Sequence, residues 1–464
     1  MIGTRPAGHR THGQAAPGRP DGLSRRTFLH TAGAAVAGLV TGRRAVARSG
    51  PLRLALIGTG IRGTGLWGRT LARGWGDVVQ HVGLCDPNPG RLAYARERIG
   101  VACPTFATLP EMIEATAPER VMVTSVDSTH AGHIATAMEM GCDVMSEKPL
   151  CTTPEQLRQI LDAQQRTGRD LIVTHNYRYS PHRARMKEIL LSGRIGRITS
   201  VDFHWYLDVY HGASYFRRWH GKERFSGTLF VHKASHHFDL LNWWIDSDPE
   251  LVTAFGDLEL YGRNGPFRSA RCRGCPHASS CAYFWDITTN EHLTRLYVDH
   301  EEHDGYLRDG CVFSDEIDIF DKMTAQIRYR NGVVVSYSCT AYSPYEGYRI
   351  AFNGTEGRLE AWIKERQPWQ EPDRDELRVT RSFGDTEVVV VPHPTGEHGG
   401  ADPRMLDRIF RAPDAPDPLR QAAGLRDGAM AVLIGFAARQ SARSGGEPVR
   451  IAELSLLVPQ ASRA

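Results

Sequence analysis

The feature that most constrains this chain is a glycine turn that follows a short apolar run. Residues 52–65 read LRLALIGTGIRGTG, so a strand-like run leads directly into Gly58, Gly60 and Gly63. With G-x-G-x-x-G spacing, the glycines allow a tight turn, a close approach of backbone N–H groups to a diphosphate, and close packing of the following helix. The positive end of that helix also favours the diphosphate. The stretch therefore predicts a dinucleotide-binding turn.

A carboxylate follows the next strand-like run. Residues 78–85 lead to Asp86, about twenty residues beyond the last glycine, where a dinucleotide fold places an acid on the adenosine ribose. A carboxylate there accepts a hydrogen bond from the 2′-hydroxyl and repels a 2′-phosphate, which favours NAD over NADP. The alternative is that Asp86, followed by Pro-Asn-Pro-Gly, only opens a turn.

The first part of the chain alternates strand-like and helix-like stretches. The helix expected at residues 153–167 begins well at Thr153-Pro154 and stops at Gly168. Alternation of this kind predicts a parallel, doubly wound sheet of the Rossmann type. The further strands are expected at residues 120–125, 143–145 and 170–174.

The pattern changes beyond Tyr177. Longer β-branched and aromatic runs predict a large, mostly antiparallel open sheet, and Asn331-Gly332 is a strong hairpin signal. These runs lie at residues 198–209, 251–261, 324–340 and 348–362, and an apolar helix is expected at 428–441. We therefore predict an α/β nucleotide-binding domain at 50–176, a substrate-binding α+β domain at 177–395 with a Cys-rich insertion at 265–311, and a C-terminal helical segment at 396–464 that packs on the body.

The first 47 residues have the features of a targeting segment. Ser24-Arg25-Arg26-Thr27-Phe28-Leu29 precedes a small, apolar run at 31–41 and the A-x-A sequence at 45–47, the pattern of a twin-arginine export signal. That run is too short to span a bilayer stably, and no later stretch reaches membrane length, so we expect no membrane insertion. We expect export to the periplasm or the extracellular space; the alternative is a basic amphipathic start to a cytoplasmic enzyme.

The charge of the chain depends on this segment. Residues 1–47 carry seven arginines and one aspartate, so the whole-chain charge of +3 becomes −3 once they are set aside. A mildly acidic body offers no attractive field for nucleic acid or for an anionic membrane surface. We therefore exclude both as partners.

Two further motifs make the pattern specific. They are Glu147-Lys148-Pro149 at a strand end and the sequence NYRYSP at residues 176–181. With the glycine turn, Asp86 and His130, they make residues 52–363 resemble the Gfo/Idh/MocA family of NAD(P)-dependent sugar and cyclitol oxidoreductases. The resemblance implies that Lys148 lies by the nicotinamide and the reacting carbon. The cofactor-binding residues we predict are Gly58, Gly60, Ile61, Arg62, Gly63, Asp86, Ser125, His130, Glu147, Lys148 and Asn176.

Lysine at this place also makes chemical sense. The carboxyl end of a parallel strand faces the ligand crevice, and a cation there favours a developing alkoxide. The pKa of a lysine falls where it is partly desolvated. The alternative is a surface Lys–Glu pair.

A histidine-rich segment supplies the candidates for proton transfer. In the sequence VHKASHHFD at 231–239, His232, His236 and Asp239 are spaced to share one face of a helix. The family resemblance places a histidine at His236 and an acid at Asp239, whereas His232 stands where the family has its first acid. We predict His236 as the general acid and base and His232 as a second catalytic candidate, because imidazole titrates near neutral pH. A metal pair at His232 and His236 is the alternative.

The loop at residues 205–225 mixes aromatic rings with polar side chains. A pyranose requires both, because its C–H face stacks on rings and its hydroxyls need directed partners. The loop is therefore either a sugar-binding wall or an ordered interface loop. Our substrate-binding candidates are Tyr179, Arg218, Trp219 and Asp239.

Four cysteines in the insertion have the spacing of a metal knuckle. Cys272 and Cys275 form C-x2-C, followed by Cys281 and Cys311. Three or four thiolates could close a structural zinc site, which we favour, and export makes disulfides the alternative.

The function we predict is an exported oxidoreductase that acts on a hydroxyl of a sugar, cyclitol or glycoside. Outside the cytoplasm no free dinucleotide pool exists, so we expect NAD to be tightly bound. Some relatives in the resembled family use NAD in a redox-neutral glycoside hydrolysis, which is the alternative activity, and a non-enzymatic sugar sensor is the third. The resemblance also implies a homo-oligomer.

Overall fold

The computed structural model describes residues 50–393 and 397–463. The export-signal prediction at residues 1–47 lies outside them. Residues 50–464 form one compact unit, so the domain boundaries at 176/177 and 395/396 stay predictions. No helix in the described part of the chain combines the length and apolar character needed to cross a bilayer.

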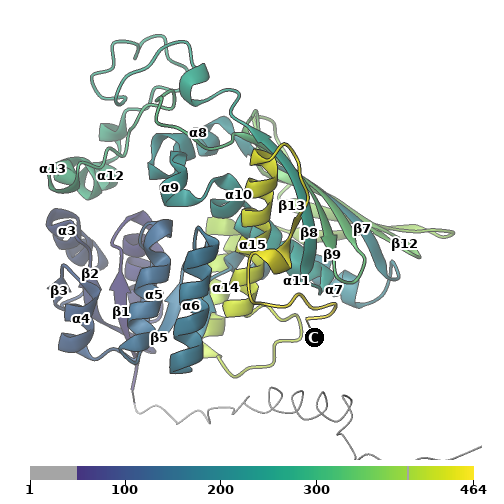
Figure 1. Ribbon diagram of the computed structural model, residues 1–464, viewed down its shortest axis with the longest axis horizontal. Helices are drawn as coiled ribbons and strands as arrows, with labels where there is room; N and C mark the ends of the chain where they lie inside the picture. Colours follow the sequence, from purple (N-terminus) through teal and green to yellow (C-terminus); the bar gives the residue numbers. More distant parts are fainter. Residues whose placement is uncertain (1–49, 394–396, 464) are drawn as a thin grey trace, which may run out of the picture. The chain divides into compact units, whose positions relative to one another are not determined.

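The first half is the parallel α/β layer predicted from the sequence (Figure 1). Its six strands are all parallel and lie in the order β3-β2-β1-β4-β5-β6. The strands are β1 (Leu52–Ile57), β2 (Val79–Cys85), β3 (Thr105–Phe106), β4 (Arg120–Val123), β5 (Asp143–Ser146) and β6 (Leu171–Val173). The connecting helices are η1 (Gly63–Thr70), α2 (Leu71–Gly74), α3 (Pro89–Ile99), α4 (Leu109–Thr116), α5 (His130–Glu139) and α6 (Pro154–Thr167).

Local sequence signals determine where these helices begin and end. The Thr153 side chain caps α6 by accepting a hydrogen bond from the N–H of Gln156, and Gly168 ends the helix at φ +62°. Such caps satisfy backbone groups that the first and last turns leave free. The predicted boundaries of this helix are confirmed.

The second half is built on a nine-stranded sheet in the order β14-β13-β12-β11-β7-β10-β9-β8-β15. Only the β7–β10 pair is parallel; the other pairs are antiparallel, as predicted. The hairpin between β9 and β10 turns at Gly332, at φ +88°. The strands are β7 (Ile198–Asp208), β8 (Pro249–Asp257), β9 (Lys322–Tyr329), β10 (Val334–Ser343), β11 (Glu346–Gly354), β12 (Gly357–Arg366), β13 (Arg374–Arg381), β14 (Thr386–Pro392) and β15 (Val449–Arg450).

Helices cover one face of this sheet and bring the active-site segments toward the first half. Every residue of α11 (Ala234–Ile245) is buried, and α15 (Leu425–Arg443) packs on β8 and α11. The remaining helices are α7 (Pro181–Leu191), α8 (Val209–Arg217), α9 (Glu223–Ser226), α10 (Leu229–His232), α12 (Glu291–Leu296), α13 (Glu301–Asp304) and α14 (Ala401–Leu406).

The predicted single helix through the histidine segment is wrong. It consists of α10, which ends at His232, and α11, which begins at Ala234, with Lys233 between them. The His236 N–H bonds to the Lys233 carbonyl instead of continuing the α10 ladder. The chain from His232 to His236 therefore makes a tighter turn at Lys233 instead of one regular α-helix.

Candidate active site

The glycine turn joins β1 to η1 with the geometry that the spacing predicted. Gly58 has φ +92°, and a Cβ there would lie 2.6 Å from the Ser125 nitrogen. A Cβ on Gly63 would overlap the Gly58 carbonyl oxygen. At Gly60, by contrast, a Cβ would meet only the Tyr297 hydroxyl, at 3.4 Å. The turn is thus packed against its neighbours at two glycines and open at the middle one, which suits a close-lying ligand.

Asp86 lies beside this turn at the end of β2. Its Oδ2 accepts from the Thr59 N–H at 2.8 Å and its Oδ1 from the Asn88 N–H at 3.0 Å. Arg91 Nη1 donates to Oδ1 at 3.3 Å. Asp86 therefore stands next to the glycine turn and also opens the turn into α3, so the two interpretations of this residue are compatible.

Glu147 and Asn176 belong to one buried polar network. Glu147 Oε1 accepts from Arg62 Nε at 2.6 Å and from Trp67 Nε1 at 2.8 Å. Asp402 of α14 accepts from Arg62 at 3.1 Å and from Asn176 Nδ2 at 2.7 Å. The Asn176 Oδ1 atom is buried and has no partner among the described residues. An unsatisfied buried acceptor of this kind fits a donor from a bound ligand.

Ser125 and His130 lie between the glycine turn and the Glu-Lys-Pro segment. Ser125 Oγ is 2.7 Å from Thr129 Oγ1. The two ring nitrogens of His130 are 2.8 Å from the Pro149 carbonyl and 3.2 Å from the Ser125 carbonyl. Burial lowers the pKa of His130. This histidine therefore ties the loop after β4 to the loop that carries Lys148.

Lys148 lies at the end of β5, where the two halves of the chain meet. Its Nζ donates to the His232 carbonyl at 3.3 Å. Burial lowers the pKa of Lys148 to about 8, and the nearby carboxylates of Asp127 and Glu147 limit the fall. An ammonium with so low a pKa can hold or release a proton near neutral pH.

A short contact joins His232 to Asp127, a residue that the sequence does not mark as a candidate. His232 Nδ1 lies 2.5 Å from Asp127 Oδ2, and both side chains are buried. Burial lowers the pKa of His232 well below its usual value, which keeps the ring neutral. Burial also raises the pKa of Asp127, while the charges of Lys148 and Arg218 act against that rise. A carboxylate on one imidazole nitrogen fixes the orientation of the ring and leaves the other nitrogen for a reacting group.

His236 has a different environment. Its ring stacks on Tyr177 with centroids 4.0 Å apart, and its Nδ1 is buried without a partner among the described residues. The Tyr177 hydroxyl accepts from Lys233 Nζ at 3.1 Å. Burial, then the charges of Lys148 and Lys233, hold the pKa of His236 well below its usual value. It too is a neutral imidazole in the same region as Lys148.

Of the four predicted substrate residues, the structure brings two to this region. The Trp219 ring lies 5.9 Å from His232, and the charge of Arg218 acts on His232 and Asp127. Asp239 is instead fully buried in an ion pair with Arg178, at 2.6 and 2.8 Å. Tyr179 packs in the apolar core of the first half. Asp239 and Tyr179 are therefore structural residues of the interior and do not face the region around Lys148 and His232.

The Arg178 pair gives a stability prediction. Replacing Arg178 by leucine leaves the buried Asp239 carboxylate without its cation, which costs about 3 kcal/mol or more of unfolding free energy. Urea denaturation measures this. The matched control is Arg185→Leu, whose exposed pair with Glu188 contributes less than about 1 kcal/mol. Equal losses in the two variants would contradict a structural role for the Arg178–Asp239 pair.

The four cysteines of the insertion are not gathered into a metal site. Cys272, Cys275, Cys281 and Cys311 are all free thiols, and within residues 50–393 and 397–463 no cluster of three or more Cys, His, Asp or Glu side chains has metal-binding geometry. Arg217 Nη1 donates to the Cys272 sulfur at 3.1 Å instead. The described residues thus give no support to the predicted zinc site or to the disulfide alternative.

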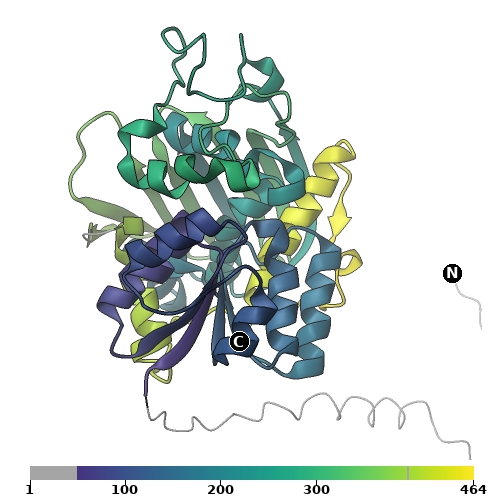
Figure 2. The ribbon, with the colours of Figure 1, turned by 90° about the vertical axis from the view of Figure 1, so that its left-hand side faces the viewer.

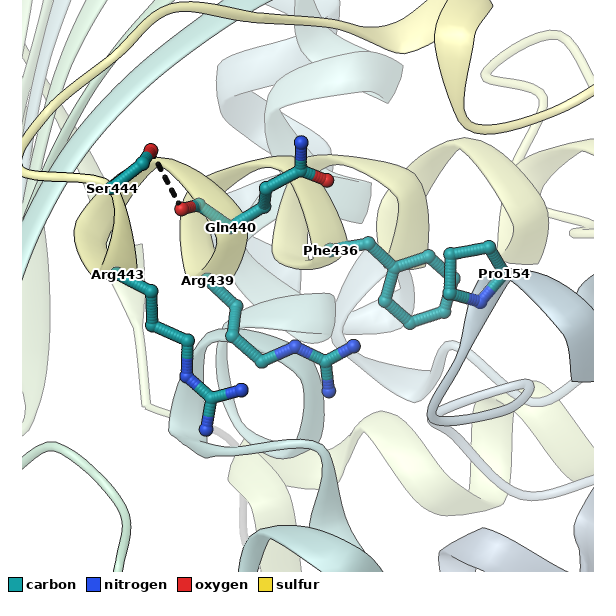
Figure 3. A pocket seen from close by; sticks show the side chains of 6 residues that line it. All are labelled: Pro154, Phe436, Arg439, Gln440, Arg443 and Ser444. Carbon is teal, nitrogen blue, oxygen red and sulfur yellow. Dashed lines mark hydrogen bonds between the residues drawn. The ribbon is translucent and has the colours of Figure 1, made fainter.

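A surface cavity lies away from this centre. It has a volume of about 390 Å³ and is lined by side chains of α15 and by Pro154 at the start of α6, with the Phe436 ring against that proline (Figure 3). None of the predicted site residues lines it. We therefore do not assign it to the active site.

The sequence analysis did not identify Asp127 or Asp402 as members of the site. Asp127 follows the carboxyl end of β4, so the rule that placed Ser125 and His130 could have found it. Asp402 comes from a segment with no motif and reaches the site only through tertiary folding. Asp402 is 340 residues from its partner Arg62.

Comparisons with known proteins match both halves of the chain. Residues 52–175 match the family model "Oxidoreductase family, NAD-binding Rossmann fold", and residues 187–451 match "Oxidoreductase family, C-terminal alpha/beta domain". Bacillus subtilis putative oxidoreductase YteT is 36% identical over 381 residues, which cover 76% of this chain and 87% of that protein. Agrobacterium fabrum inositol 2-dehydrogenase is 31% identical over 194 residues, 41% of this chain and 54% of that enzyme.

Solved structures show the same fold. Levoglucosan dehydrogenase, in a complex with NADH and levoglucosan, has a TM-score of 0.62 at 20% identity and covers 86% of this chain and 99% of its own. The WlbA dehydrogenase from Bordetella pertussis, with NADH and UDP-GlcNAcA, has a TM-score of 0.60 at 19% identity and covers 86% and 98%. With both halves of the chain matched by the family models, the protein belongs to the Gfo/Idh/MocA family of NAD-binding oxidoreductases.

Proposed function

We propose that the protein is an exported enzyme that oxidises or reduces a hydroxyl of a sugar, cyclitol or glycoside with tightly bound NAD. The observation that carries the proposal is the meeting of three groups. Lys148 follows β5 and donates to the His232 carbonyl, and the His232 ring pairs with Asp127, which follows β4. In an open α/β sheet this edge is where ligands bind. A cation and an oriented neutral imidazole there are the groups that alcohol oxidation needs.

The residues of the first half fit a dinucleotide. The open backbone at Gly60, the Asp86 carboxylate beside the turn and the unpartnered Asn176 oxygen are the groups that would hold it. Bound there, NAD would supply the acceptor for the hydride that leaves the substrate carbon. Asp86 favours NAD over NADP, because its charge repels a 2′-phosphate.

The protein's own groups handle the proton. His232, held by Asp127 through Nδ1, presents Nε2 to take the proton of the substrate hydroxyl. Lys148 stabilises the negative charge that develops on the same oxygen. His236, the acid and base favoured by the sequence, lies in the same region without an orienting carboxylate, so we assign the proton step to His232. In the reverse direction His232 returns the proton to the carbonyl oxygen.

The insertion explains how the cofactor would be retained. Helices α12 and α13 lie next to α3 of the nucleotide-binding half (Figures 1 and 2). The Tyr297 hydroxyl accepts from the Ile61 N–H at 2.9 Å, within the glycine turn. Asp304 accepts from Asn88 at 2.9 Å and from Arg91 at 2.7 Å. The insertion therefore closes over the edge where Asp86 and the turn would hold the dinucleotide.

Loosening this cover should release the cofactor. In Asp304→Ala the contacts to Asn88 and to Arg91 of α3 are both lost. We expect NAD to dissociate about tenfold faster, because each charged hydrogen bond contributes about 1.5–3 kcal/mol. The measurement is the NAD content of purified protein during dialysis. Asp299→Ala, at an exposed position of the same insertion, is the control. Identical retention in both variants would show that the insertion does not hold the cofactor.

The second candidate activity is redox-neutral glycoside hydrolysis. The Arg25-Arg26 motif favours it, because an exported enzyme that regenerates its own NAD needs no external dinucleotide. Release of nitrophenol from a chromogenic glycoside, without net NADH, would identify this activity. Net NADH formation from a free sugar or cyclitol would identify the dehydrogenase.

Mass spectrometry of the small molecule bound to the purified protein tests the common part of both activities. We expect NAD in about equimolar amount, and a panel of sugars, cyclitols and glycosides then assigns the reaction. A folded protein that holds no nicotinamide compound, and binds none when it is added, would refute the proposal.

We also propose twin-arginine export and a homo-oligomer. Cell fractionation of the wild type and of an Arg25→Lys/Arg26→Lys variant tests the export, since the variant should stay in the cytoplasm.

Light scattering of the purified protein tests the oligomer, and a monomer mass would refute it. The large sheet offers exposed apolar side chains for assembly, among them Phe255, Val334 and Trp362.

A further inference from the structure

The starting observation is one buried arginine without a counter-charge. Four arginines of the described chain are buried: Arg91, Arg178, Arg183 and Arg308. The first three each form an ion pair with a carboxylate. Arg308 forms none with any described residue, and its Nε and Nη1 atoms are buried without a hydrogen-bond partner. Burying a cation in this way is costly unless an anion pairs with it.

Aromatic rings hold the Arg308 side chain in place. Its guanidinium carbon lies 5.3 Å from the centre of the Trp285 ring and 5.8 Å from that of Tyr297. Contacts of this kind offset part of the desolvation cost but leave the N–H groups unused. The side chain is therefore fixed with donors available for a ligand.

A second arginine lies close enough to repel it. Arg218 donates from Nε to the Ser214 carbonyl at 2.7 Å and packs over the Tyr215 ring, but it pairs with no described carboxylate. Burial, and then the charge of Arg308, lowers the pKa of Arg218 to about 10. Two mutually repelling cations are stable together when an anion lies between them.

A histidine links these arginines to the catalytic group. His220 stacks on Trp219 at 3.5 Å and meets the His232 ring edge-on at 4.3 Å. Its Nδ1 is buried without a partner in the described part of the chain. The charges of Arg218, Arg308 and Lys148 all act on it. The unpaired donors therefore adjoin the place where the substrate hydroxyl would react.

We propose that Arg218 and Arg308 bind an anionic substituent of the substrate, a carboxylate or a phosphate, so that the enzyme acts on a charged sugar derivative in preference to a neutral one. The guanidinium fork matches both oxyanions. This rests on the proposed function, since it names the substrate class of the same site. The competing role for these arginines is to bind the diphosphate of the cofactor, because Tyr297 contacts both Arg308 and the glycine turn.

The test is a binding panel on the purified protein with its retained cofactor. Calorimetry measures the Kd of hexuronates, hexose 6-phosphates and neutral hexoses in the gluco, galacto and manno series. We expect at least one charged member to bind about tenfold or more tighter than its neutral counterpart, since hydrogen bonds to charged groups are the strong ones. The member that binds best distinguishes a carboxylate from a phosphate.

Two variants and a control assign the effect to the arginines. In Arg308→Gln and Arg218→Gln the ratio of the Kd of the neutral sugar to the Kd of the charged sugar should fall toward one. The NAD content of both variants should be unchanged. Arg263→Gln removes the same charge from an exposed position near the insertion and should keep the preference.

In the binding experiments, three outcomes would overturn the inference. The first is equal binding of charged and neutral sugars by the wild type, and the second is no binding of any charged member. The third is a loss of NAD affinity in Arg308→Gln with the sugar preference intact, which would assign the arginines to the diphosphate. Oxidation of neutral sugars alone would refute the charged substrate and leave the proposed function standing. Arginine-dependent binding of a charged sugar without any redox or hydrolytic turnover would refute the proposed function and leave the charged-ligand site standing.

Discussion

Replacing Lys148 by methionine should lower kcat by about 1000-fold, because it removes the cation that donates to the His232 carbonyl while keeping the length of the side chain. The loss should appear in kcat more than in KM, since the charge is needed for the developing alkoxide and less for the neutral hydroxyl. Steady-state kinetics with the best substrate of the panel measures both constants. Lys322→Met, on an exposed lysine of β9, is the matched control.

The pH profile gives this prediction a second readout. Burial lowers the pKa of Lys148 to about 8, so the ammonium is present below pH 8 and lost above it. If the ammonium is the active form, kcat/KM of the wild type falls as the pH rises through 8. That limb should be absent in Lys148→Met. Wild-type activity that keeps rising above pH 8, or a Lys148→Met variant with normal kcat, would remove Lys148 from the mechanism.

Replacing Asp127 by asparagine should also cost about 1000-fold in kcat. The amide keeps the shape but can hold His232 in the wrong tautomer, and general bases contribute about 10²–10⁴-fold. The folded protein should keep its NAD, because the Asp127 side chain pairs with His232 and not with the residues proposed to hold the dinucleotide.

A double-mutant cycle separates this role from simple packing. His232→Gln alone and Asp127→Asn/His232→Gln together should be nearly as inactive as Asp127→Asn, because residues that act as a unit give non-additive losses. Additive losses would mean that the two side chains act separately. Full activity in His232→Gln with loss in His236→Gln would transfer the proton step to His236.

The fold was largely predictable because its signals are local. The glycine turn, the caps of α6 and the Asn331-Gly332 hairpin each depend on a few neighbouring residues, and all three appear where the sequence places them. The two sheet types follow from the change in pattern beyond Tyr177. The break between α10 and α11 was not predictable from periodicity, because His232 and His236 have helical spacing whether or not the helix is continuous.

Only the part of the site that comes from short sequence motifs was predictable. Lys148 and Glu147 could be placed because a short motif ends a strand. Asp127 could have been placed at the same sheet edge by its position after β4. Its pairing with His232 could not, since 105 residues of sequence separate the two and no pattern joins them. The same holds for Arg308, whose significance lies in the absence of a partner among the described residues and so appears only after folding. Asp239 has the spacing of a site residue, yet its carboxylate is taken by Arg178.

The final part of the chain has a consequence for protein engineering. Beyond the large sheet, Asp402 bonds to Arg62 and Asn176, Asp407 accepts from the indole of Trp75, and the Ala423 carbonyl accepts from the N–H of Val173 in β6. The nucleotide-binding half is thus completed by residues encoded at the opposite end of the gene. A chimera in which residues 50–176 come from a relative would also need that relative's residues at the positions of 402–423. The nucleotide-binding half therefore cannot be exchanged alone.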